Sequence, residues 1–327
     1  MELPTPTGWV RPMNDVSLHI EAGESLGLVG ESGSGKTILA LALMGLLPVG
    51  ARVKGEAWLR KDVNEVKEAK EKNASGSGVG ERMNLEVLNE REWRAVRGGE
   101  IAMVFQEPMT SLNPVMRIGA QIEEAIWAHE TGLASGDVKR RAAEALRRAA
   151  IPEPEVRAEQ FPHQLSGGLR QRAMIAMALA AGPRLLIADE PTTALDVTVQ
   201  KQILDLLDRL RRELRLGLLF ITHDLGVVAQ VADRVAVMYA GRMIEEGPAH
   251  QVLAAPRHPY TQGLLNASPT LERGKLSPIP GSVPPLTALP PGCAFEPRCS
   301  FRRAECVAAV PGLRAADASH TARCVLV

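Results

Sequence analysis

An eight-residue stretch, Gly30-Glu-Ser-Gly-Ser-Gly-Lys36-Thr37, limits the possible folds of this chain more than any other feature. It follows an apolar segment over 25–29, which predicts a buried strand, and it precedes a helical pattern over 38–47. The spacing G-x-x-x-x-G-K-[ST] between a strand and a helix predicts a loop whose backbone N–H groups hold phosphate. The predicted nucleotide-binding residues are Gly30, Glu31, Ser32, Gly33, Ser34, Gly35, Lys36 and Thr37.

Two residues of this loop have distinct predicted roles. The ammonium group of Lys36 is predicted to pair with the β- and γ-phosphates of a nucleotide, and the hydroxyl of Thr37 to ligate Mg²⁺. The alternative is a flexible Gly/Ser loop, which the flanking strand and helix argue against.

Two carboxylates follow a second apolar segment. Asp189 and Glu190 come directly after Leu185–Ala188, at the expected carboxyl end of a buried strand. A magnesium nucleotide needs one carboxylate near the metal and another group to polarise the attacking water. Asp189 is therefore predicted to hold Mg²⁺, and Glu190 to act as the general base.

Two further polar residues end apolar segments. His223 follows Leu218–Thr222, and Gln106 follows Ile101–Phe105. Taken alone, a histidine or glutamine at a strand end is more often structural than catalytic. Both gain weight from the motifs around them.

Apolar strands alternate with helical patterns, which predicts an α/β fold with a parallel sheet and ligands at the carboxyl ends of its strands. Arg234–Tyr239 and Met243–Glu246 predict a hairpin that closes this domain. The pattern over 116–150 is helical and predicts a small helical subdomain, placed at about 107–165. The segment at about 61–83 is charged and rich in Gly and Ser, which predicts an exposed insertion.

The chain after His258 is Pro-rich and cannot continue a sheet, so we place a domain boundary between 1–257 and 258–327. The second part contains all the cysteines: Cys293, Cys299, Cys306 and Cys324. In a cytosolic protein such a cluster indicates a metal or iron–sulfur site rather than disulfides. The spacing lacks the tight knuckles of zinc sites and is compatible with a [4Fe–4S] cluster, with Zn²⁺ or no metal as alternatives.

The composition limits the partners. Thirty-eight basic and thirty-eight acidic residues leave no net charge, so nothing suggests a nucleic-acid partner. No segment reaches about 18 uninterrupted apolar residues, the length that spans a bilayer as a helix, and the first residues lack a secretory signal. We expect a cytoplasmic polypeptide that would work at a membrane only as a peripheral subunit.

A further motif completes a known set. Leu165-Ser-Gly-Gly168, opening a helix shortly before Asp189, resembles the signature motif of ABC ATPases, a P-loop NTPase family. With residues 30–37, Gln106, Asp196 and His223, it gives the motifs of that family in their usual order. The finer resemblance is to ATPase subunits of dipeptide, oligopeptide and nickel importers, in FQEPMTSLNP (105–114), LSGGLRQR (165–172), ADEPTTALDVTVQ (188–200), HPYTQGLL (258–265) and the cysteine tail.

The resemblance implies an ABC ATPase fold with an antiparallel β subdomain, a helical subdomain and a small C-terminal cysteine module. It implies that two ATPase subunits pair head to tail, with Asp196 at their interface. The residues that would bind the partner's ATP are Ser166, Gly167 and Gly168. Gln106 would sense Mg²⁺ and the attacking water, and His223 would contact the γ-phosphate.

The resemblance also implies transport driven by ATP hydrolysis. The expected partners are two transmembrane permease subunits, a second ATPase subunit that is usually a paralogue, and an extracytoplasmic substrate-binding protein. The chain would lie on the cytoplasmic face of the inner membrane and power import of peptides or nickel. Members with this cysteine tail look like cluster-binding proteins, which favours [4Fe–4S].

The chain departs from the family pattern at its start, where the usual opening strand is shortened or missing. Trp9 is then the candidate for stacking on adenine, with a surface role as the equal alternative. Two other functions stay open: a soluble ABC ATPase acting on nucleic acid or ribosomes, and a regulatory half-site that binds ATP without turnover. The intact Glu190 argues against the half-site.

Overall fold

The computed structural model describes residues 1–6, 8–60, 82–107, 111–193, 195–268 and 277–327. Most of the insertion predicted at 61–83 therefore lies outside the described residues, and only its last two positions belong to a described strand. Within the described part of the chain, no helix is both long and apolar enough to cross a membrane.

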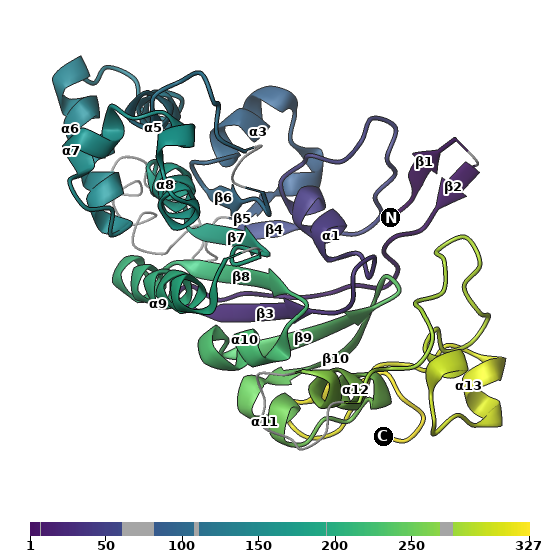
Figure 1. Cartoon of the computed structure of the whole chain (residues 1–327). Coiled ribbons are helices and arrows are strands. Elements are labelled where there is room, and N and C mark those ends of the chain that lie inside the picture. Colours follow the sequence, from purple (N-terminus) through teal and green to yellow (C-terminus); the bar gives the residue numbers. More distant parts are fainter. Residues whose placement is uncertain (7, 61–81, 108–110, 194, 269–276) are drawn as a thin grey trace.

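A central eight-stranded sheet organises the molecule (Figure 1). Its strands are β3 (Ser25–Val29), β6 (Ile101–Val104), β7 (Leu185–Asp189), β8 (Gly217–Thr222), β9 (Arg234–Tyr239), β10 (Arg242–Pro248), β11 (Arg314–Ala315) and β12 (Thr321–Ala322). The spatial order is β11-β12-β10-β9-β3-β8-β7-β6, and the strands from β9 to β6 are parallel. This confirms the parallel sheet that the alternating pattern predicts.

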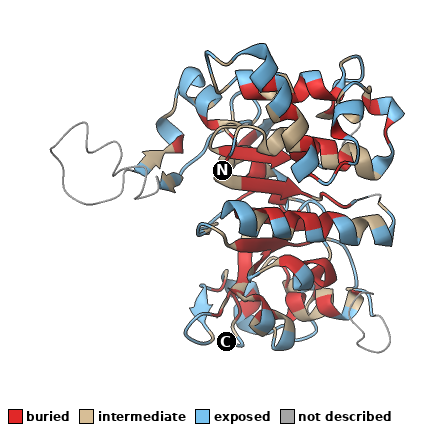
Figure 2. Ribbon diagram, turned by 90° about the vertical axis from the view of Figure 1, so that its left-hand side faces the viewer, coloured by how far each residue is buried: buried red, intermediate tan, exposed pale blue. Residues whose placement is uncertain are grey.

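Helices cover both faces of the sheet. One face is covered by α1 (Lys36–Leu43) and α3 (Glu90–Val96), and the other by α8 (Gly167–Leu179), α9 (Val197–Leu214), α10 (Leu225–Val231), α11 (Ala249–Ala254) and α12 (Pro259–Ala267). In β8, Leu218 and Phe220 join one core cluster, while Leu219 and Ile221 join the other. Successive side chains of a strand point to opposite faces, so a strand buried on both sides is apolar throughout. Figure 2 shows the sheet as a buried layer.

Helix α1 ends at Leu43, earlier than the predicted end at Leu47. The cause is Gly45, whose φ of 61° is left-handed and ends the helix. The N–H of Leu46 then donates to the carbonyl of Leu41 at 2.8 Å. The sequence pattern misled because residues 46 and 47 are apolar although they lie outside the helix.

A separate helical unit stands beside the sheet. It consists of α5 (Ile118–Trp127), α6 (Ser135–Arg148) and α7 (Pro154–Ala158), which pack with α8. Its core includes Ile122, Ile126 and Leu146, and it is distinct from the two clusters on the sheet. These helices lie where the helical subdomain is predicted, although its exact bounds stay a prediction.

The predicted hairpin of β9 and β10 forms, but it does not end the sheet. β12 pairs with β10, and β11 pairs with β12. The pairing of β12 with β10 is explained by Glu245 on β10, whose carboxylate is fully buried. It accepts the N–H groups of Arg257 at 2.6 Å and His258 at 2.8 Å, and it lies 2.7 Å from Nε2 of His320, next to β12.

Smaller elements complete the fold. Two antiparallel pairs lie outside the central sheet, β1 (Leu3–Thr5) with β2 (Gly8–Val10) and β4 (Trp58–Arg60) with β5 (Arg82–Asn84). The family resemblance implies an antiparallel β subdomain without assigning strands to these residues. The remaining elements are η1 (Leu85–Val87), η2 (Pro162–Gln164), η3 (Glu296–Arg298) and α13 (Ala304–Ala308).

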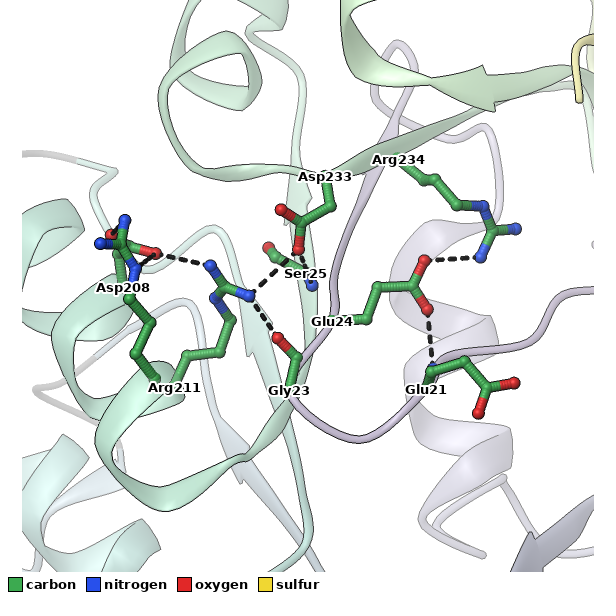
Figure 3. A network of polar contacts seen from close by, with 9 residues as sticks. Glu21, Gly23, Glu24, Ser25, Asp208, Arg211, Asp233 and Arg234 are labelled. Carbon is green, nitrogen blue, oxygen red and sulfur yellow. Dashed lines mark hydrogen bonds and ion pairs between the residues drawn. The ribbon is translucent and has the colours of Figure 1, made fainter.

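A polar network fixes the start of β3 (Figure 3). Arg211 on α9 donates to Asp208 at 2.9 Å and to Asp233 at 3.1 Å. It also donates to the carbonyl of Gly23, just before β3. Asp233 accepts the N–H of Ser25 at 2.8 Å. Because β3 leads directly into residues 30–37, this network sets where that loop begins.

Candidate active site

Residues 30–37, here called the phosphate loop, connect β3 to α1. Gly33 and Gly35 have φ angles of 79° and 105°, in the left-handed region that favours glycine. A Cβ atom at Gly35 would lie 2.6 Å from the carbonyl oxygen of Pro12. Both the backbone shape and the close approach of Pro12 therefore require glycine at position 35.

Lys36 is buried within this loop. Its Nζ donates to the carbonyl oxygens of Gly30 at 2.7 Å and Glu31 at 3.0 Å. Burial lowers the pKa of Lys36, while the nearby carboxylates of Glu190 and Asp189 oppose that shift. A cation is thus held between the loop backbone and the two predicted acidic residues, which suits the binding of an anion.

Asp189 ends β7 beside the phosphate loop and is 2% exposed. Its carboxylate accepts a hydrogen bond from the Thr37 side chain, and burial raises its pKa. Among the described residues, its Oδ1 has no hydrogen-bond partner although it is buried. Mg²⁺ takes oxygen ligands, so a hydroxyl beside a carboxylate with an unpartnered oxygen fits this ion.

Glu190 joins three side chains that come from separate parts of the chain. Its Oε2 lies 3.4 Å from Nε2 of Gln106 and 2.9 Å from Oγ1 of Thr193, and its Oε1 lies 3.4 Å from Nδ1 of His223. The structure therefore brings together the three residues predicted to act in catalysis. The sequence does not predict Thr193, because a threonine in a loop carries no signal of its own.

The signature residues lie at helix starts, and none of their described contacts reaches the phosphate loop. Ser166 caps α8 by accepting the N–H of Leu169 at 3.4 Å. A Cβ atom at Gly168 would lie 2.8 Å from a methyl group of Val199, so glycine there allows α8 to approach α9. Asp196 caps α9 by accepting the N–H of Val199 at 2.9 Å. Gly167 opens α8, and a Cβ atom there would lie 3.8 Å from a methyl group of Leu195.

Trp9 lies on β2 and is 47% exposed. The guanidinium of Arg52 stands 4.0 Å from the centroid of its ring, a cation–π contact. One face of the indole is therefore covered by an arginine. Its stacking on adenine stays a prediction.

The four cysteines line a single pocket between η3, α13 and the last residues of the chain. Burial raises the pKa of Cys293 to about 11 and also raises the pKa values of Cys299 and Cys324. However, no group of three or more His, Cys, Asp or Glu side chains in the described residues is arranged to hold a metal ion. Within the described part of the chain, the four cysteines thus line one pocket without forming such a group, and the metal site stays a prediction.

Comparison with known proteins agrees with this geometry. Residues 13–193 match the sequence model of the ABC transporter family, and residues 244–306 match that of the C-terminal region of oligopeptide/dipeptide transporters. The chain belongs to the ABC transporter family. It carries an ABC ATPase domain, formed by the sheet and the phosphate loop described above.

Relatives within this family are similar over nearly the whole chain. A protein of Brucella melitensis, named for peptide import and ATP binding, is 50% identical over 96% of this chain and 90% of its own length. The oligopeptide transport ATP-binding protein OppD of Bacillus subtilis is 49% identical over 90% of this chain and 77% of its own length. The relatives and family models named here give no support to a nucleic-acid or ribosome partner.

Solved structures of ABC proteins share the fold. The ATP-binding cassette MJ0796, solved as a dimer bound to ADP and Pi after hydrolysis, has a TM-score of 0.58 and 26% identity, covering 76% of this chain and 95% of that one. The cbiO1 protein of Clostridium perfringens has a TM-score of 0.59 at 24% identity and supports the fold alone, over 78% of this chain and 88% of its own.

Proposed function

We propose that this chain is the ATP-hydrolysing subunit that powers peptide import through an ABC transporter. The observation that carries the proposal is the meeting of Gln106, Glu190 and His223 beside Lys36 and Asp189. The substrate class is supported by the names of the relatives and by the match of residues 244–306 to peptide transporters. A related substrate such as nickel is the alternative cargo.

The proposed roles follow from the positions of the side chains. The backbone N–H groups of the phosphate loop and Lys36 bind the phosphates of ATP, and Thr37 and Asp189 hold Mg²⁺ with help from Gln106. Mg²⁺ supplies neutralisation of the phosphate charge. Glu190 orients and deprotonates the attacking water, and His223 contacts the γ-phosphate.

A second ATPase subunit completes the proposed site. Ser166, Gly167 and Gly168 lie at the start of α8, where N–H groups and the helix dipole favour an anion. Since none of their contacts within the described residues reaches the phosphate loop, we assign these three residues to the ATP of the partner, with Asp196 at the interface. Co-purification of the transporter would show whether the partner ATPase subunit is a paralogue or a second copy of this chain.

The remaining partners follow from the importer assignment. Two transmembrane permease subunits and an extracytoplasmic substrate-binding protein would complete the transporter, which places this chain on the cytoplasmic face of the inner membrane. The domain division at 257/258 stays part of this proposal. Uptake of a labelled peptide by cells that express the chain with its permease tests whether the cargo is a peptide. Uptake of nickel in place of the peptide would show that nickel is the cargo.

The C-terminal cysteine module is proposed to bind a [4Fe–4S] cluster, with Zn²⁺ as the alternative. Support comes from a donor set of four cysteines around one pocket. Four cysteine thiolates are the usual ligands of a [4Fe–4S] cluster. Iron and sulfide analysis of protein purified without oxygen tests this, and zinc or no metal would refute the cluster.

A substitution at Glu190 tests the function. Glu190→Gln is expected to bind MgATP like the parent and to lose turnover by at least about 100-fold, because the general base is gone. The matched control is Glu213→Gln, at an exposed position on α9, which should hydrolyse ATP normally. Phosphate release is measured together with ATP affinity, and unchanged hydrolysis by Glu190→Gln would refute the assignment of the base.

A further inference from the structure

Glu31, the second residue of the phosphate loop, is held by the C-terminal part of the chain. Arg298 donates to both oxygens of the Glu31 carboxylate, at 2.7 and 3.0 Å. The Arg298 side chain is only 4% exposed. A two-pronged, charge-assisted pair of this kind fixes the orientation of both partners.

Arg298 is itself fixed by its surroundings. Its Nε donates to the carbonyl of Pro280 at 2.9 Å, and its guanidinium stands 5.9 Å from the rings of Tyr239 and Phe295. Tyr260 belongs to the same aromatic group, with its ring 4.6 Å from that of Tyr239.

The same aromatic group also holds the backbone of the loop. The hydroxyl of Tyr260 accepts the N–H of Glu31 at 2.8 Å. Glu31 is therefore held at its side chain by Arg298 and at its backbone by Tyr260. The carbonyl of Glu31 accepts from Lys36, so this contact lies one hydrogen bond from the predicted phosphate ligand.

The position of Arg298 depends on the fold of the cysteine module. Arg298 ends η3 and lies between Cys293 and Cys299. The N–H of Cys293 donates to the carbonyl of Cys306 at 2.7 Å, and the N–H of Cys299 donates to Glu296 at 3.1 Å. A change in the cysteine segment would therefore displace the guanidinium from Glu31.

Charge gives this contact a consequence for nucleotide binding. Without Arg298, the carboxylate of Glu31 would be an unpaired negative charge in the loop that receives a triphosphate. Repulsion between them would weaken binding, since the site is partly shielded from solvent. Arg298 neutralises that charge and holds the loop in place.

We propose that Arg298 is a positioning residue for nucleotide binding and that, through Glu31, it makes the affinity for ATP depend on the fold of the cysteine module. The inference rests on the proposed ATPase function and adds regulation of that site from a part of the chain outside it.

The test compares a single and a double substitution in the full chain, measured by titration with a fluorescent ATP analogue and Mg²⁺. Arg298→Gln is expected to weaken binding about tenfold, because Glu31 then carries an unpaired charge. Glu31→Gln combined with Arg298→Gln removes both charges and is expected to restore affinity to within about threefold of the parent. The matched control, Arg302→Gln, removes the ion pair between the exposed Arg302 and Glu296 in the same module and should bind ATP like the parent.

Further variants separate a specific role from a loss of fold. Arg298→Lys keeps the positive charge but cannot donate to both carboxylate oxygens as a guanidinium does. Its affinity for ATP should therefore lie between those of the parent and Arg298→Gln. For ATP hydrolysis by Arg298→Gln, KM for ATP should rise while kcat stays within about twofold of the parent, because the substitution leaves the reacting groups unchanged. Cys293→Ser should weaken ATP binding in the parent and have no added effect in the doubly substituted chain.

The outcomes are distinct. A parent chain that does not bind MgATP overturns both the proposed function and this inference. A parent that binds, with Arg298→Gln binding equally well, overturns the inference alone. Equal weakening in Arg298→Gln and the doubly substituted chain also overturns it, since charge pairing would then be irrelevant.

Discussion

At the scale of single residues, Glu190 is held in an unusual conformation. Its φ of 46° is left-handed, which costs a non-glycine residue about 1–3 kcal/mol that its surroundings must offset. The N–H of Glu190 donates to the carbonyl of Ile221 at 2.9 Å, and Thr193 donates to its carboxylate. The backbone thereby directs the carboxylate toward Gln106 and His223 rather than along the strand.

Thr193 is expected to position Glu190. Thr193→Val keeps the shape of the side chain but removes the hydroxyl that bonds Oε2 at 2.9 Å. We expect kcat to fall about tenfold with KM for ATP unchanged, the loss of roughly one hydrogen bond to a charged group. Steady-state kinetics measure this, with Thr131→Val at an exposed loop position as the control. A rise in KM with normal kcat would contradict the positioning role.

The site could be predicted from sequence only where spacing encodes it. Lys36, Asp189 and Glu190 are each predicted from a fixed pattern beside an apolar strand. The structure brings the three close together, and their roles stay predictions. The partner of Glu31 could not be found in this way, because Arg298 lies 267 positions away in sequence. Only the folded chain brings an arginine between two cysteines to the phosphate loop.

At the scale of elements, the site depends on where β3 starts. The network of Arg211, Asp208 and Asp233 fixes the residues before and at the first position of this strand. β3 is then paired in parallel with both β8 and β9, so its far end is placed within the sheet. The phosphate loop thus begins from a strand held at its start and along both edges.

Removal of Arg211 is expected to destabilise the chain. Arg211→Met keeps the apolar stem but leaves the carbonyl of Gly23 and the carboxylate of Asp233 without the Arg211 guanidinium, while Asp208 keeps Arg212 as its partner. The Arg211 side chain is 11% exposed. We expect a loss of about 2–3 kcal/mol in the free energy of unfolding, as for other largely buried charged contacts. Urea denaturation measures it.

The neighbouring arginine provides the control. Arg212 bonds the same aspartate but is 70% exposed, so Arg212→Met should cost less than about 0.5 kcal/mol. Equal losses in the two variants would show that the buried network does not anchor β3.

The elements differ in how far sequence predicts them. β3, β7 and β8 are predicted well because burial on both faces makes them continuously apolar. β12 has two residues and no alternation, so its pairing with β10 follows from the buried contact of His320 with Glu245 instead. That contact is tertiary, and no local sequence pattern predicts it.

At the scale of the whole molecule, His258 contacts the sheet, α12 and the C-terminal segment that carries the cysteines. Its N–H donates to Glu245 on β10, and its Nδ1 accepts the N–H of Tyr260 in α12 at 3.0 Å. Its ring lies 5.9 Å from that of Phe295. The imidazole is 1% exposed, and burial lowers its pKa to about 3.

This buried histidine predicts a pH dependence of stability. The unfolded chain binds a proton at this residue near pH 6.5, while the folded chain excludes it down to about pH 3. Its contribution is therefore fully present above pH 6.5 and is lost as the pH falls below that value. When the pH falls from 7 to 5, the free energy of unfolding of the parent should fall by about 2 kcal/mol more than that of His258→Asn. The asparagine keeps an acceptor for the N–H of Tyr260.

Chemical denaturation at several pH values measures this difference. The difference between the two plots of unfolding free energy against pH isolates the contribution of His258, because the other titrating groups are the same in both chains. Parallel curves for parent and variant would contradict a neutral, buried imidazole.

The pairing of β12 with β10 sets an order of events during synthesis on the ribosome. Glu245 enters a buried position, yet its partner His320 is translated 75 residues later. A nascent chain that already contains the phosphate loop and Glu190 therefore still has the Glu245 carboxylate at an unfinished sheet edge. We conclude that maturation of this edge is late, and that chains stalled before residue 320 expose a surface that chaperones and proteases can recognise.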